Sequence, residues 1–119
     1  MNYKKYPLQI TGIAVLFLTI AGLVYFNMGP NENVLLEKYR KNPEYKQFIG
    51  MIENDQKDLA NNPDKYKKAA ATMDMGLAWY NLKEYELATK WWKKGLRIEP
   101  NNQIGWYNLG NAYREIRKY

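Results

Sequence analysis

Two pairs of acidic residues are the side chains in this 119-residue chain whose types and spacing could support chemistry. Asp55 with Asp58, and Glu84 with Glu86, could form an acid and base couple or supply calcium ligands. Each pair lies among lysines, which favours a solvated surface instead. The chain has neither histidine nor cysteine, so the commonest general base, the thiol nucleophile and most transition-metal ligands are missing. We therefore expect no catalytic residues, no cofactor, no metal site and no enzyme activity.

Basic residues gather in two clusters that nucleic acid or acidic lipid could use for docking. Their members are Lys90, Lys93, Lys94 and Arg97 on a predicted helix over residues 85–98, and Lys65, Lys67 and Lys68 before it. Glu86 and Glu99 interrupt the first cluster, and Trp91 is the one aromatic candidate beside it. This composition favours a solvated outer face, and we expect no nucleic-acid partner. Adhesion to an anionic polymer or lipid stays an alternative, because the net charge of +6 is compatible with it.

A spaced pattern of aromatic residues and glycine says most about the fold. Trp106, Leu109, Gly110 and Tyr113 have the spacing W-x2-L-G-x2-Y. One period of 34 residues earlier, the matching positions hold Gly76 for Gly110, Ala78 for Ala112, Trp79 for Tyr113 and Tyr85 for Tyr119. The first copy continues with Ala88, Trp92, Gly95 and Pro100. On these residues the chain resembles a tetratricopeptide-repeat (TPR) protein, a family of helical scaffolds that bind other proteins.

The packing expected at these positions agrees with the resemblance. If Gly76 and Trp79 lie on one helix and Ala88 and Trp92 on the next, the small residues let two backbones approach while the rings fill the space beside them. By this register Gly76, Gly95 and Gly110 are predicted to be helix-contact glycines and not a phosphate-binding loop. We expect an all-α fold of antiparallel helix pairs in a TPR-like α-solenoid, with one repeat at 69–102.

Residues 103–119 are predicted to be the first helix of a second, incomplete repeat. Repeat units cannot bury their apolar surface alone, so Trp106, Leu109 and Tyr113 need a cover. Three interpretations stay open. This helix is a polar cap, the sequence is a fragment of a longer array, or the face is completed by a partner or by a second copy of the chain.

Residues 8–26 form an uncharged apolar stretch, LQITGIAVLFLTIAGLVYF. As a helix it would span about 28 Å, close to the roughly 30 Å hydrocarbon core of a bilayer. The stretch is longer than the apolar region of a cleaved signal, and no A-x-A-like site follows it promptly. We predict a single transmembrane helix that acts as an uncleaved signal anchor.

Charge on the two sides of the stretch predicts its orientation. Lys4 and Lys5 precede it, whereas the first charged residues after it are Glu32 and Glu37. Because positive residues favour the cytoplasmic side, residues 1–7 are expected in the cytoplasm and the repeats outside a bacterial cytoplasmic membrane. Residues 27–33 combine Gly, Pro and Asn, and they are predicted to form a short linker.

Residues 34–68 are predicted to be a helical region. A short helix is expected over 34–41, with Asn42 and Pro43 ending it and starting the next. An apolar stripe at helical spacing follows, made of Tyr45, Phe48, Ile49, Ile52 and Leu59. This stripe needs a partner, which the helix after Pro63 would supply. The region is either a degenerate earlier repeat or a helical cap of the array.

The resemblance also implies a binding surface, because the first helices of successive TPR pairs line a concave groove. By register the groove positions here are Ala70, Met73, Leu77, Tyr80, Asn81, Ile104, Tyr107, Asn111, Arg114 and Glu115. Asn111 matches one asparagine of the clamp with which some relatives hold a terminal carboxylate. Met73 and Tyr107 stand where that clamp needs lysine, so we do not expect it here. The alternative for Met73 and Leu77 is simple core packing.

These features together predict a non-catalytic, single-pass membrane protein with a small TPR scaffold. Its partner would be a protein or peptide bound in the concave groove, in the assembly of an envelope or membrane complex. The alternative is a structural subunit of a larger membrane complex or homo-oligomer, in which a partner completes the terminal helix. The first interpretation predicts a folded, monomeric helical domain, and the second predicts obligate association.

Overall fold

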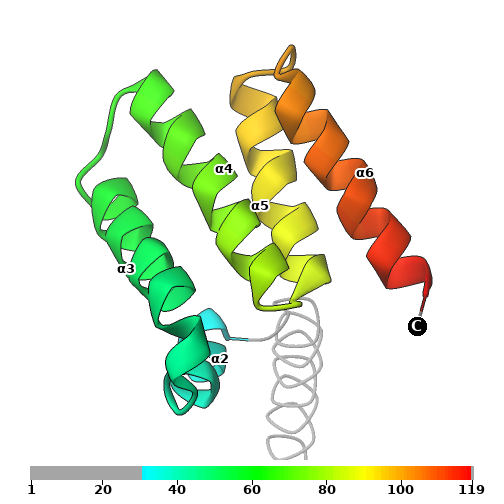
Figure 1. Cartoon of the computed structure of the whole chain (residues 1–119). Coiled ribbons are helices and arrows are strands. Elements are labelled where there is room, and N and C mark those ends of the chain that lie inside the picture. The colour runs from blue at the N-terminus through cyan, green and yellow to red at the C-terminus, as the bar shows by residue number, and fades with distance from the viewer. Residues whose placement is uncertain (1–30, 119) are drawn as a thin grey trace, which may run out of the picture. The chain divides into compact units, whose positions relative to one another are not determined.

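The computed structural model describes residues 31–118, which are helical and contain no β-strand (Figure 1). Its elements are α2 (Glu32–Arg40), the short 3-10 helix η1 (Pro43–Tyr45), α3 (Lys46–Ala60), α4 (Lys65–Asn81), α5 (Tyr85–Ile98) and α6 (Gln103–Arg117). The chain divides into two compact units, residues 1–35 and 36–119, and the second contains α3 to α6. The all-α prediction is therefore confirmed for the described part.

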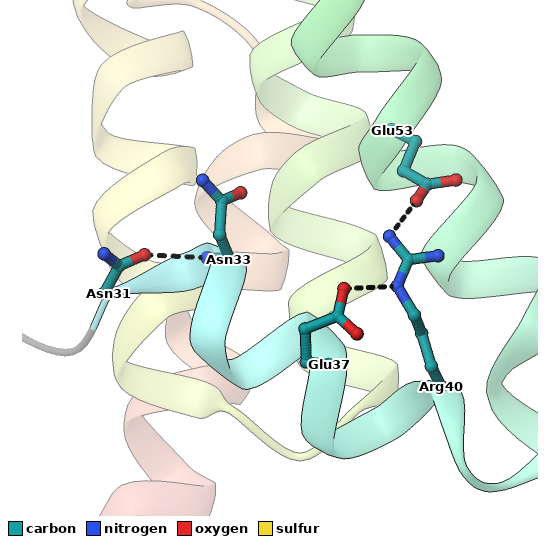
Figure 2. Close-up of polar contacts among 5 residues, drawn as sticks. All are labelled: Asn31, Asn33, Glu37, Arg40 and Glu53. Carbon is teal, nitrogen blue, oxygen red and sulfur yellow. Dashed lines mark hydrogen bonds and ion pairs between the residues drawn. The ribbon is translucent and has the colours of Figure 1, made fainter.

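The expected membrane segment at 8–26, its flank at 1–7 and most of the 27–33 linker lie outside the described residues. Within residues 31–118, every helix is too short or too polar to cross a bilayer. The helix expected over 34–41 begins earlier, at Glu32. Its start is set by Asn31, whose side-chain oxygen accepts a hydrogen bond from the backbone N–H of Asn33 at 3.0 Å (Figure 2).

Polar side chains at the predicted turns cap the starts of η1, α4 and α6. Asn42 accepts from the N–H of Glu44, Asp64 from that of Lys67, and Asn102 from that of Gly105, at 3.0, 2.9 and 2.8 Å. Each bond satisfies one of the donors that the first turn of a helix leaves unpaired. The start of α6 at Gln103 is where the Pro100 to Asn102 turn predicts it.

The connection between α4 and α5 is tight. Lys83 has a φ of 63°, in the left-handed region, and the N–H of Glu84 donates to the carbonyl of Trp79 at 2.9 Å. This turn reverses the chain within three residues, so that α4 and α5 run antiparallel and side by side (Figure 1). The lapse of apolar periodicity at Lys83 and Glu84 is the sequence signal for it.

The core lies where α4 packs on α5, with α3 on one side and α6 on the other. Its largest fully buried side chains are Trp79, Trp92, Ile52, Met75 and Leu82. Ala78 and Ala88 are also fully buried. α3 packs on α4, the predicted partner, and Ile49 and Ile52 of the predicted stripe are buried.

Gly76 of α4 lies directly against the Trp92 ring of α5. A Cβ atom at this glycine would lie 2.7 Å from Cε2 of the Trp92 ring and closer still to Cδ1 and Nε1. The Trp92 indole N–H also donates to the backbone carbonyl of Met73 at 3.1 Å. The ring is thus held against a backbone position where a side chain larger than that of glycine would clash.

Arg40 ties the end of α2 to α3. Its guanidinium contacts Glu37 at 2.8 Å and also pairs with Glu53 of α3 (Figure 2). On the same helix the Tyr39 hydroxyl donates to Glu84, and burial together with that carboxylate raises the pKa of Tyr39. The Arg40 pairs are exposed, so solvent screens them and they contribute little to stability.

We expect Gly76→Ala and Gly110→Ala to change stability in opposite directions. The first forces an added methyl into the Trp92 ring and should lower the free energy of unfolding by about 1 to 2 kcal/mol, even after the better helix propensity of alanine. The second adds a methyl in open space and should raise it by about 0.5 to 1 kcal/mol. Urea unfolding followed by tryptophan fluorescence measures both. Changes of the same sign would contradict the packing described.

Candidate functional site

The predicted groove positions lie on α4 and α6, and we call this set of residues the α4–α6 face. Its members are Ala70, Met73, Leu77, Tyr80 and Asn81 of α4, and Ile104, Tyr107, Asn111, Arg114 and Glu115 of α6. Leu77, Ile104 and Tyr107 have exposed fractions of 41, 73 and 69%. These three side chains are large and apolar, and exposed large apolar side chains on neighbouring helices are typical of a binding surface.

The two helices of this face meet at Met73. Its side-chain methyl and sulfur lie against the positions of Gly95 in α5 and Gly105 in α6. Tyr80 is half-buried too, with its ring 5.2 Å from that of Tyr85 and 5.7 Å from that of Trp92, measured between centroids. Met73 and Tyr80 therefore contribute mainly to packing between helices, which for Met73 is the alternative given in the sequence analysis. Leu77, in contrast, is exposed to solvent.

Polar groups edge the face. The Asn81 side chain donates to the carbonyl of Leu77 at 2.8 Å, and Arg114 donates to Asn111. Lys118 pairs with Glu115 at 2.8 Å. Each of these bonds joins residues three or four apart along the chain.

The signature residues divide into a buried set and an exposed set. Gly76, Trp79, Ala88, Trp92 and Leu109 are buried. Pro100, Trp106, Gly110 and Tyr113 are exposed, although the Trp106 indole N–H donates to the carbonyl of Pro100 at 2.7 Å. The prediction that Gly110 is a helix-contact glycine is wrong for the described residues. Beyond its own helix backbone and chain neighbours, no heavy atom of this part of the chain lies within 4 Å of where its Cβ would be.

A third acidic residue joins the pair Asp55 and Asp58. Asp74 of α4 lines the same pocket of about 480 Å³, together with Pro63, Lys67 and others on α3 and α4. Burial, with the nearby charges of Asp74 and Asp58, raises the pKa of Asp55 to about 6. Burial also raises the pKa of Asp74. The sequence could not indicate Asp74, because only the packing of α3 on α4 brings it to the pair.

No group of three acidic side chains in residues 31–118 is arranged to hold a metal ion. Glu84 and Glu86 do not act together either, since Glu84 accepts from the Tyr39 hydroxyl while Glu86 is exposed.

The basic cluster of α5 is spread over two surfaces. Lys94 lies over the Trp91 ring at 4.2 Å, in a pocket of about 450 Å³ that Leu59, Lys68 and other residues also line. Lys93 instead lies over the Tyr113 ring of α6 at 5.4 Å. Stacking of Lys94 on Trp91 occupies the aromatic surface that a nucleic-acid base would need.

Asp55 should make stability depend on pH. Its folded pKa, about 6, lies above the ordinary value of 3.8, so the folded state binds the proton more tightly than the unfolded state. The loss of stability caused by the charged Asp55 carboxylate is complete above pH 6. It diminishes as the pH falls through 6 toward 3.8, because the folded state takes up the proton first. Urea unfolding at about pH 7 and about pH 5 should show higher stability at the lower pH.

The control for this effect is Asp55→Asn. This substitution should raise the free energy of unfolding by on the order of 1 kcal/mol at pH 7, after allowance for solvent screening of a half-exposed group. It should also make the free energy of unfolding less dependent on pH. Asp58→Asn, at an exposed position of the same helix, should leave most of the dependence in place. A pH dependence that is unchanged in Asp55→Asn would contradict the assignment.

Comparison with known proteins bears on this part of the chain. Residues 76–115 match the family model described as TPR repeat, about a third of the chain. No curated protein and no solved structure matches the chain. The matched segment runs from Gly76 of α4 through α5 to Glu115 of α6. It supports the TPR resemblance over the glycine and aromatic pattern that first suggested it, and TPR repeats are typically non-catalytic modules for protein–protein interaction.

Proposed function

We propose that this protein is a non-catalytic scaffold that binds a segment of another polypeptide along the α4–α6 face. The observation that carries the proposal is the joint exposure of Leu77, Ile104 and Tyr107 on two helices that contact each other. The TPR match covers all three of these residues and ends within α6. An exposed leucine and tyrosine are suited to holding apolar side chains of a guest chain.

The guest is an extended or helical segment with one or two apolar anchors. Asn81, Asn111 and Arg114 lie at the borders of the apolar surface, where they offer amide and guanidinium groups to the backbone of the guest. Arg114 already bonds Asn111, and Met73 and Tyr107 bring no positive charge. A guest held along its length therefore fits this face better than a guest held by its terminal carboxylate.

The scaffold is attached to a membrane by residues 8–26 in this proposal, with its repeats on the extracytoplasmic side. The support is the uncharged length of that stretch and the distribution of lysine around it. A tethered scaffold of this kind would hold its guest during assembly of an envelope or membrane complex.

Photocrosslinking tests the binding face. Benzoylphenylalanine in place of Tyr107 should give adducts with a polypeptide in the source cells, because the side chain lies open on the face. The same probe in place of Lys90, an exposed residue of α5, should not. Adding Leu77→Asp should reduce the Tyr107 adduct at least fivefold, while Lys90→Asp should leave it unchanged. Adducts with lipid alone, or an adduct that is insensitive to Leu77→Asp, would overturn the proposal.

Membrane attachment has its own test. The full chain should stay in the membrane pellet after extraction at alkaline pH, and deletion of residues 8–26 should release it. Protease added outside cells whose outer barriers have been opened should then remove the repeats. Repeats that stay protected while a known extracytoplasmic protein is cut would reverse the proposed orientation.

A further inference from the structure

The beginning of α4 and the end of α5 lie at the same end of the helical unit (Figure 1). The pocket of about 450 Å³ at this end also reaches α3, and we call it the α3–α5 pocket. Three of the residues that line it are cationic, namely Lys68 of α4 and Lys94 and Arg97 of α5. No aspartate or glutamate of residues 31–118 lines it. The pocket therefore gathers positive charge from two helices.

The positive surface continues beyond the pocket along both helices. Lys65 is exposed one turn before Lys68 on α4, and Lys90 is exposed one turn before Lys94 on α5. The side chains of Lys68 and Arg97 are exposed too, so an anion in solution can reach them. A hollow with low-dielectric walls focuses the field of the charges around it, which attracts anions.

The two glutamates that interrupt the basic residues in the sequence lie outside the pocket. Glu86 is exposed and does not line it. Glu99 does not line it either, and its carboxylate accepts a hydrogen bond from the side chain of Asn102 at 3.2 Å. The sequence pattern favours a solvated outer face because of these glutamates, and that argument does not hold at the pocket itself.

The rest of the pocket wall is mainly apolar, which bears on the kind of anion that fits. Leu59 of α3 and Trp91 and Ile98 of α5 supply the apolar surface. The hydroxyl of Thr72 already donates to two backbone carbonyls of its own helix, at 2.9 and 2.8 Å. An acidic phospholipid has a phosphate directly beside glycerol and acyl carbons, so it offers charge to the cations and hydrocarbon to the apolar wall.

The predicted membrane segment would bring such lipids close to the pocket. Only residues 27–31 separate that segment from α2, a length of at most about 18 Å when fully extended. A short tether of this kind raises the effective concentration of the bilayer surface around the helical unit.

We infer that the α3–α5 pocket docks the headgroup of an anionic phospholipid. The phosphate lies between Lys68 and Arg97, and the glycerol lies against Leu59 and Ile98. The choice of a lipid as the anion rests on the proposed membrane attachment. It does not rest on the α4–α6 face, which shares no residue with the pocket.

Co-flotation with vesicles tests the docking. The labelled full chain is embedded in phosphatidylcholine nanodiscs and mixed with vesicles of phosphatidylcholine, either pure or with about 30 mol% phosphatidylglycerol. Flotation of the nanodiscs, after subtraction of empty nanodiscs, should be at least fivefold greater with phosphatidylglycerol. It should fall severalfold as salt is raised from about 50 to about 300 mM, because charge pairs contribute. Equal flotation with the two kinds of vesicle would overturn the inference.

Charge-reversal variants locate the site. Lys68→Glu combined with Arg97→Glu should reduce flotation at least fivefold. The matched control is Lys46→Glu combined with Lys57→Glu, at two exposed positions of α3 outside the pocket, which changes the net charge equally and should reduce flotation less than twofold. Equal losses in the two pairs would mean that net charge alone draws the chain to the vesicles, and they would overturn the inference.

Two further variants guard against a loss of folding. Lys68→Arg combined with Arg97→Lys keeps both charges and should keep flotation within twofold of the original chain, while circular dichroism checks that every variant stays helical. Leu77→Asp on the α4–α6 face should also leave flotation unchanged. A loss of flotation in Leu77→Asp as large as that in the charge-reversed pocket would contradict a site at the pocket.

Soluble competitors identify the ligand. Dihexanoyl phosphatidylglycerol should release the nanodiscs from the vesicles at a concentration at least tenfold lower than glycerol phosphate does, because only the lipid brings hydrocarbon to the apolar wall. Equal potency would mean that the pocket takes phosphate alone. Greater potency of an oligonucleotide or of polyglutamate, compared per charge, would assign the pocket to nucleic acid or to an acidic protein. Either result would overturn the inference.

The lipid site and the membrane anchor fail separately in these tests. Release of the full chain by alkaline extraction, with flotation still dependent on Lys68 and Arg97, would refute the anchor and support the lipid site. Retention of the chain after extraction, with flotation equal on both kinds of vesicle, would support the anchor and overturn the lipid site.

Discussion

The arrangement of the described helices depends on the contact between the Trp92 ring and the backbone of α4 at Gly76. Because the ring lies against a position without a side chain, α4 and α5 approach closely, and Ala78 and Ala88 can both be fully buried. The hydrogen bond from the indole to Met73 fixes the ring in register along α4. The Met73 side chain in turn lies against Gly95 of α5 and Gly105 of α6, so the first turn of α6 packs next to the same contact.

The proposed binding face follows from this packing. Most contacts of α4 are with α3 and α5, and Leu77 stays exposed on α4 as Tyr107 does on α6. On α6, Trp106 and Tyr113 are exposed beside the pocket that Lys93 and Arg97 also line.

Much of this arrangement could be predicted from the sequence. The 34-residue register of glycine and aromatic residues predicts the α4–α5 pair, and Pro100 to Asn102 predict the start of α6. Both features depend on residues that are close together in the sequence, through turn formation and the packing of adjacent helices. Gly110 shows the limit, since a repeat position implies a contact only if a neighbouring helix is there to make it. Asp74 shows another, because its effect on Asp55 arises from the packing of two helices.

A double-mutant cycle between Gly76→Ala and Trp92→Leu tests the central contact most directly. If the ring is the reason that position 76 must be glycine, Gly76→Ala should be far less costly once the ring is gone. The coupling energy in urea unfolding should then be about 1 to 2 kcal/mol, as for residues in direct contact. Additive effects of the two substitutions, with no coupling, would contradict the account.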